Sequence, residues 1–227
     1  MRTWDEIDDR LSYFLDDTTT DETDRTWRER LRINSWNWAQ DMFCAHTPLS
    51  KVVTLEVLAD TRTGRLPDDF YAMDMLHDTT EDRWLSTARR RQGDIRYTDD
   101  DVLEYWLWGG ELKLEKAYTE AGTDLQLYYW AFYPALEFVV DATTGAVTVE
   151  QNQIHTPRWA ELALLHLTAA NILAPGEMQA SYLGEWDTRQ DSGNPIQNPR
   201  LKSIEFHVRM YDDILGRFPK ANVGRSG

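Results

Sequence analysis

The sequence has only one cysteine, Cys44, among its 227 residues. One cysteine excludes a disulfide within the chain, and this is typical of proteins that fold in a reducing cytoplasm. The first residues, Met1 to Glu6, lack the apolar core that a secretory signal needs. We therefore expect the chain to be folded and assembled in a reducing cytoplasm.

Long hydrophobic runs are also missing. The most apolar stretch, from Thr156 to Pro175, is interrupted by Arg158, Glu161, His166 and Asn171. A helix that crosses a membrane needs about 20 consecutive, mainly apolar residues. The sequence therefore predicts no membrane-spanning helix and no membrane partner.

The same stretch instead predicts a buried helix. Thr156 can cap the helix with its hydroxyl, Pro157 suits the first helical position, and Pro175-Gly176 is expected to end it. Apolar residues fall on nearly every face in between, and a helix of this kind is buried. We predict that it forms the centre of a helical bundle.

Positive charge is scarce. The chain has 24 Lys and Arg residues against 39 Asp and Glu residues, which gives a formal net charge of −15. Such a surface repels phosphate, so binding to nucleic acid or to an anionic membrane is disfavoured. The one basic run, Arg83 to Arg91, is flanked by Glu81, Asp82 and Asp94, and we interpret it as a solvated or subunit-facing patch.

Motifs for catalysis or metal binding are missing too. The five histidines stand at no metal-ligand spacing from one another: His46, His77, His155, His166 and His207. Cys44 and His46 have no further ligand nearby, and Ser192 has no base placed by the sequence. The chain has neither a nucleophile-elbow motif nor a phosphate-binding loop. We therefore predict no catalytic residue, no metal, no cofactor and no enzyme activity.

An alternative function rests on the aromatic residues. Trp106, Trp108 and Trp130 lie in the same region as Glu104 and Glu111. Tryptophans beside two carboxylates are typical of sites that bind or hydrolyse sugars. Adjacent acidic residues also occur throughout this acidic chain, where they usually solvate a surface. A carbohydrate-acting enzyme or a sugar-binding module therefore stays open as the alternative.

What the sequence does contain is two kinds of periodicity. Helical spacing predicts helices over residues 3 to 16, 22 to 44, 156 to 175, 177 to 190 and 199 to 219. Alternation predicts strands over 52 to 58, 70 to 76 and 124 to 133, and hairpins over 103 to 116 and 137 to 149. The predicted fold is therefore α+β, mainly an α-helical bundle with an inserted small antiparallel β-sheet layer.

The predicted domain organisation follows from the same pattern. Residues 1–48 and 150–219 are expected to form the helical bundle, and residues 49–149 the inserted antiparallel sheet region. Residues 220–227 are expected to be a tail that is flexible or ordered by a partner.

Five segments carry a resemblance to a known family. In chain order they are Leu31 to Ala39, Leu66 to Phe70, Tyr128 to Pro134, Pro157 to Ala163 and Asp191 to Pro199. Their order and content resemble the head-to-tail adaptors of tailed phages, a connector or gatekeeper family similar to tail tubular proteins. The resemblance extends from about Leu31 to Pro219.

The resemblance implies a structural virion protein in the neck between head and tail. Such a protein forms a homo-oligomeric ring, commonly of about twelve copies, beneath the portal protein. The ring extends the DNA channel and provides the platform for the tail tube or nozzle protein, and DNA passes through without specific binding. A negative channel wall suits this passage, because Lys and Arg contacts would hold the phosphates. A further alternative is that the chain belongs to the tail tube or nozzle itself.

Overall fold

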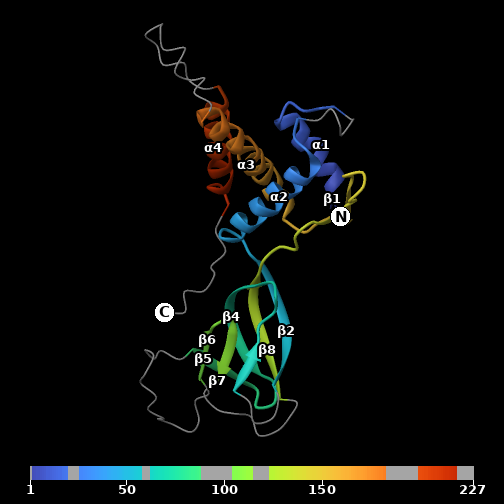
Figure 1. The fold of residues 1–227 in the computed structure, drawn as a ribbon. Coiled ribbons are helices and arrows are strands. Elements are labelled where there is room, and N and C mark those ends of the chain that lie inside the picture. Colours follow the sequence, from blue (N-terminus) through green and yellow to red (C-terminus); the bar gives the residue numbers. More distant parts are fainter. Residues whose placement is uncertain are drawn as a thin grey trace. The chain divides into compact units, whose positions relative to one another are not determined.

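The computed structural model describes residues 2–19, 26–57, 62–87, 104–114, 123–182 and 199–218. These residues fall into two compact units. The helical unit comprises Met1–Thr47 and Tyr133–Lys220, and the sheet unit is centred on Pro48–Phe132. Each unit has its own core, and we describe them in turn (Figure 1).

The helical unit contains four helices, one 3-10 turn and two small strand pairs within the described residues. The helices are α1 (Trp4–Phe14), α2 (Glu29–Cys44), α3 (Glu161–Tyr182) and α4 (Pro199–Leu215), and η1 (Arg158–Ala160) is the 3-10 turn. The strands are β1 (Arg2–Thr3), which pairs with β11 (Gln153–Ile154), and β9 (Glu137–Val140), which pairs with β10 (Val147–Gln151). In Figure 1, α1 and α4 lie on opposite sides of α3.

The core of the helical unit forms where α1 and α2 meet. Trp4, Ile7 and Leu11 are buried at helical spacing on α1. Trp36 of α2 packs edge-on against Trp4, with ring centroids 6.4 Å apart. The two tryptophans are fully buried, so this contact ties α2 to the N-terminal helix.

α3 is buried along its first half, as the sequence predicts. Nearly every residue from Ala163 to Ala170 is buried. The predicted ends, however, are wrong. Thr156 makes no cap: a 3-10 turn precedes α3, and the Thr156 hydroxyl has no hydrogen-bond partner among the described residues. α3 also continues through Pro175 to Tyr182. A proline inside a helix removes one backbone hydrogen bond, but this local cost does not end the helix here.

The sheet unit contains seven strands in one sheet within the described residues. They are β2 (Leu49–Val57), β3 (Thr63–Arg65), β4 (Phe70–Asp78), β5 (Arg83–Thr87), β6 (Glu104–Trp108), β7 (Glu111–Leu114) and β8 (Thr123–Ala131). Their order is β2-β8-β4-β5-β6-β7-β3, and all neighbours are antiparallel except β5 and β6. The outermost strands β2 and β3 also contact each other, so the sheet curls around its core.

Alternation along the strands places one side of the sheet in that core. Leu125, Leu127 and Tyr129 of β8 are buried, whereas the residues between them point to the other face. Leucines of the neighbouring strands, among them Leu76 and Leu112, fill the same core. The sheet unit is therefore held by one apolar layer on its inner face.

The predicted fold class is wrong. Of the described residues, 39% are α-helical and 34% are in strands, so the protein is not a mainly helical bundle with a small added sheet. Sequence reasoning missed β3 and β5, which are short and contain Thr, Gly, Arg and Ser. Such strands form because neighbouring strands supply hydrogen bonds, and a local sequence pattern does not report this.

Several element predictions are confirmed and two need correction. The Gly109-Gly110 hairpin, the hairpin turn at Gly145 and the helix that follows Asn198 are present, and the three glycines have positive φ. The second helix starts at Glu29, so its predicted first turns at 26–28 are wrong, and 22–25 lie outside the described residues. The predicted helix over 177–190 is the end of α3 up to Tyr182, and 183–190 lie outside the described residues.

Candidate functional site

The outer face of the sheet carries a cluster of exposed aromatic side chains. Register places Met75 beside Tyr128, and His77 beside both Trp84 and Gln126. Trp106 and Trp108 lie two residues apart on β6, next to β5. Together with the outward residues of β2 and Trp130 of β8, these side chains form what we call the aromatic face.

Ring contacts across strands join three members of the aromatic face, which are His77, Trp84 and Tyr128. The ring centroid of Trp84 lies 4.5 Å from that of His77 and 5.5 Å from that of Tyr128. Trp84, Trp106 and Trp108 are nevertheless 55%, 42% and 59% exposed. Soluble proteins rarely leave a large apolar patch exposed to solvent, and such a patch usually marks a binding surface. The three exposed tryptophans therefore indicate a binding surface on this sheet.

Charge is scarce on the aromatic face. Its described positions on β2, β8, β4, β5 and β6 are Ser50, Val52, Thr54, Gln126, Tyr128, Trp130, Met75, His77, Trp84, Trp106 and Trp108. None of these is Asp, Glu, Lys or Arg, although these types make up 28% of the chain. On the next strand, β7, Lys113 lies beside Trp106 and Glu111 beside Trp108, so an ion pair borders the tryptophans of β6. Enrichment in Trp, Tyr and Met with depletion of charge is typical of the centre of a protein–protein interface.

The carboxylates proposed for sugar chemistry do not converge on these tryptophans. Glu111 lies opposite Trp108 in register, and its carboxylate accepts a hydrogen bond from Lys113 at 2.5 Å. Trp130 is half-buried, and its indole N–H has no partner among the described residues. The side chain of Glu104 lies outside the described residues. No described pair of carboxylates therefore flanks a tryptophan on this face.

One carboxylate in each of three adjacent acidic pairs has a structural role. Asp8 binds the buried Arg32, and Asp17 accepts backbone hydrogen bonds that shape the turn before α2. Asp69 accepts hydrogen bonds from Lys51 at 2.5 Å and from Tyr129 at 3.0 Å. Burial alone would raise the pKa of Asp69, but these two donors lower it below its usual value.

The residues first considered for nucleophilic or metal chemistry are buried in packing positions. Cys44 is fully buried, and burial raises the pKa of its thiol, which disfavours the reactive thiolate. His46 lies between Phe43 and Trp159. Across the described residues, no group of three or more His, Cys, Asp or Glu side chains is placed to hold a metal ion. Ser192 lies outside the described residues.

A polar cleft of about 680 Å³ lies in the helical unit where β1, α1 and the start of α3 meet. Glu161, the first residue of α3, is buried at its base, and both carboxylate oxygens bind arginines: one binds Arg2 and the other Arg10. Arg2 also donates to the carbonyl oxygen of Thr156. This arrangement fixes the N-terminal strand to α3 and leaves Glu161 without a free oxygen for proton transfer.

Sequence reasoning missed three of these features. These are the aromatic face, the Arg2–Glu161–Arg10 cluster, and a contact between the buried rings of His166 on α3 and His207 on α4, whose Nδ1 atoms lie 2.8 Å apart. Each joins residues from different elements. Only the alternation of tryptophans at 106 and 108 pointed to one of them in advance.

Within the described residues, no helix is long and apolar enough to cross a membrane. No protein-family profile matches the sequence, and no curated protein shows significant similarity to it.

Proposed function

We propose that the chain is a structural protein of a tailed-phage virion, a head-to-tail adaptor that forms a ring beneath the portal. In this role it extends the DNA channel and provides the platform on which the tail attaches. The observation that carries the proposal is the aromatic face. It is an exposed aromatic surface with few charged side chains, bordered by the Lys113–Glu111 ion pair, and this combination suits a permanent contact with another protein.

Several further observations support the proposal. The five segments that resemble the adaptor family include residues of both units. Leu31 to Ala39 lies in α2 with Trp36 at the core, and Tyr128 to Ala131 ends the central strand β8. A formal charge of −15 per copy would line a channel from which DNA phosphates are repelled. The cleft at Glu161 and the buried Cys44 and His46 have structural explanations. This favours a role in the assembly of protein subunits over a role in catalysis.

The experiment is to mix the purified chain with the portal protein encoded by the same genome and to image the product. We expect a ring of this chain on one end of the portal and no other site of attachment. A chain that never decorates the portal at any concentration contradicts the proposal.

The aromatic face supplies a second test, toward the tail component. The double substitution Trp84→Ser and Trp106→Ser should abolish binding of the tail tube or nozzle protein to portal-bound rings. The ring itself should still form, because neither residue is in the helical unit. Tyr13→Ser is the control, since Tyr13 is an even more exposed aromatic residue and lies on α1 of the helical unit.

A sugar-binding module is the second candidate, favoured by the three open tryptophans on one face. Tryptophan rings stack on sugar rings as they do on other apolar surfaces. A glycan array with the wild-type chain and the Trp84→Ser, Trp106→Ser variant distinguishes the adaptor from the sugar-binding module. Glycan binding that is lost in the variant would favour the sugar-binding module, and no glycan binding by either chain would exclude it.

A further inference from the structure

The outer side of α2 carries a row of exposed apolar side chains. Leu31, Trp38 and Met42 are 36%, 40% and 50% exposed, and spacings of seven and four residues place them on one face of the helix. The opposite side of α2, with Trp36 and Phe43, is buried in the core of the helical unit. α2 therefore has two apolar faces, and the described chain covers only one of them. We call the exposed row the α2 stripe.

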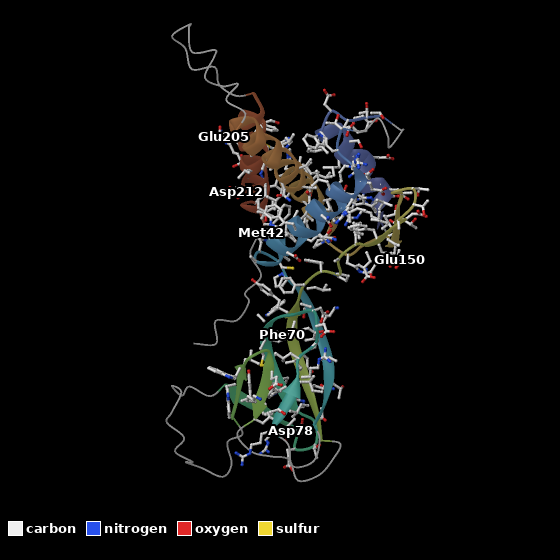
Figure 2. The ribbon with its side chains drawn as sticks, in the orientation of Figure 1. Met42, Phe70, Asp78, Glu150, Glu205 and Asp212 are labelled. Carbon is white, nitrogen blue, oxygen red and sulfur yellow. The ribbon has the colours of Figure 1, made fainter. Side chains whose placement is uncertain are left out.

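The outer side of α4 forms a shallow groove that is largely open to solvent. Its lining residues all come from α4: Ile204, Glu205, Val208, Arg209, Asp212 and Asp213. Val208 is an exposed apolar residue in the middle of this groove, and Asp212 and Asp213 are exposed near its C-terminal end. Figure 2 shows Glu205 and Asp212 on α4, and Met42 on α2. We call this surface the α4 groove.

Charges at the ends of the two surfaces are complementary when the helices run antiparallel. Arg28 and Arg30 are exposed at the start of α2, and Asp212 and Asp213 are exposed near the end of α4. Within the described part of the chain, none of these four side chains forms an ion pair. At the other end, Asp41 would face the N-terminus of α4, where the helix dipole favours negative charge.

The lengths of the two surfaces also agree. Arg30 and Asp41 are separated by about 16 Å along α2, and α4 spans about 20 Å from its start to Asp212, at roughly 1.5 Å per residue. The apolar residues Trp38 and Val208 then lie between the charged ends. An antiparallel pair of helices with apolar contacts in the middle and ion pairs at the rim is a common interface arrangement.

We propose that the α2 stripe of one copy packs into the α4 groove of a second copy of this chain. The stripe and the groove are different surfaces, so each copy can offer its groove to one neighbour and its stripe to another. A head-to-tail contact of this kind generates a closed ring when the rotation between copies closes. The inference rests on the proposed ring and names the contact that builds it.

Disulfide trapping tests the contact directly. Asn34 is exposed on α2 between Leu31 and Trp38, and antiparallel packing places it opposite Val208. A chain that carries Asn34→Cys and Val208→Cys should give a ladder of dimers, trimers and larger species on oxidation, seen on a non-reducing gel. The native Cys44 is buried and does not interfere.

Matched controls fix the interpretation of the ladder. Each single substitution should give dimers at most, since a head-to-tail chain needs both cysteines. Asp9→Cys combined with Val208→Cys should give no ladder, because Asp9 is exposed on α1 outside the α2 stripe. An absent ladder with the Asn34 and Val208 pair overturns the proposal, and so does an equal ladder with the Asp9 pair.

Charge reversal gives a second, independent readout. Replacing Arg28 and Arg30 by Glu should weaken association about tenfold in light scattering, which corresponds to two rim ion pairs. Adding Asp212→Arg and Asp213→Arg to the same chain should restore it. Equal association of wild-type and Arg28→Glu, Arg30→Glu chains would contradict the contact.

The two proposals can be contradicted independently. If the chain decorates the portal but gives no disulfide ladder, the adaptor role is supported and the contact between the α2 stripe and the α4 groove is contradicted. If the chain gives the ladder but does not bind the portal, the contact is supported and the adaptor role is contradicted.

Discussion

His166 on α3 and His207 on α4 meet through their Nδ1 atoms at 2.8 Å. Both rings are buried, and Phe14 of α1 packs edge-on against His166 with a centroid distance of 4.8 Å. One Nδ1 donates and the other accepts, so the pair is satisfied when both rings are neutral. One protonation leaves the hydrogen bond possible, because a charged ring can still donate to the neutral one, but it places a charge in a buried site; a second protonation removes the acceptor.

Acid should destabilise the helical unit through this pair. Burial, together with the neighbouring His207, lowers the pKa of His166 to about 4 from its ordinary value of 6.5. The unfolded chain therefore binds the proton more readily than the folded one, and stability is lost as the pH falls from 6.5 toward 4. We expect a loss on the order of 2 kcal/mol in urea unfolding between pH 7 and pH 4.5 from this group.

A double variant isolates the histidine contribution from that of the carboxylates. His166→Leu with His207→Leu replaces both partners by apolar groups, which leaves no unpaired nitrogen. Its stability should depend less on pH over the same range than that of the wild type. An unchanged pH dependence would exclude the pair as its source. His155→Gln serves as the control outside the pair.

The buried pair of Arg32 and Asp8 should show strong coupling. Arg32 has no exposed surface, and its guanidinium binds Asp8 and donates to the Ser12 hydroxyl at 3.0 Å. Arg32→Leu should cost about 3–5 kcal/mol of unfolding free energy, because it removes the arginine that compensates the charge of a buried carboxylate. Adding Asp8→Leu should recover most of that loss in a double-mutant cycle. Additive effects would contradict the coupling.

Neighbouring positions of β8 should respond differently to substitution. Leu127 is fully buried, so Leu127→Ala should cost about 2–5 kcal/mol. Tyr128 lies on the opposite face and is half-buried, so Tyr128→Ser should cost clearly less. Thermal unfolding of the two variants measures the difference. A larger loss from Tyr128→Ser would mean that the two faces are exchanged.

The hairpin between β6 and β7 should require glycine. Gly110 has a φ of +79°, a region that other residues rarely adopt, although the space around it is open. Gly110→Ala should therefore cost about 1 kcal/mol through backbone strain. Gly64→Ala is the matched control, because Gly64 has no positive φ and an added methyl would meet Leu112 at an ordinary 3.7 Å. Equal stability losses in the two variants would contradict this explanation.

Local patterns in the sequence were sufficient for most single elements. The apolar stretch after Thr156 predicted a buried helix, because residues on every face leave no side for solvent. Alternation around Leu125 and Leu127 predicted β8, and the glycine pair at 109 and 110 predicted a hairpin. These features depend on residues close together in the chain.

The α2 helix shows where such reasoning fails. Apolar residues at helical spacing occur on two sides of this helix: Leu31, Trp38 and Met42 are exposed, whereas Trp36 and Phe43 are buried. A helix with two apolar faces gives no local indication of which one its own chain covers. That choice depends on Trp4 and on the other residues that α1 and α3 bring against it.

The sequence by itself determined that the chain is acidic, nearly free of cysteine, and divided between helical and alternating segments. Only the tertiary structure decided that seven strands join into one sheet, that its tryptophans share one outer face, and that His166 meets His207. The physical reason is that strand pairing and side-chain contacts depend on residues far apart in the chain, and local periodicity does not predict which distant residues meet.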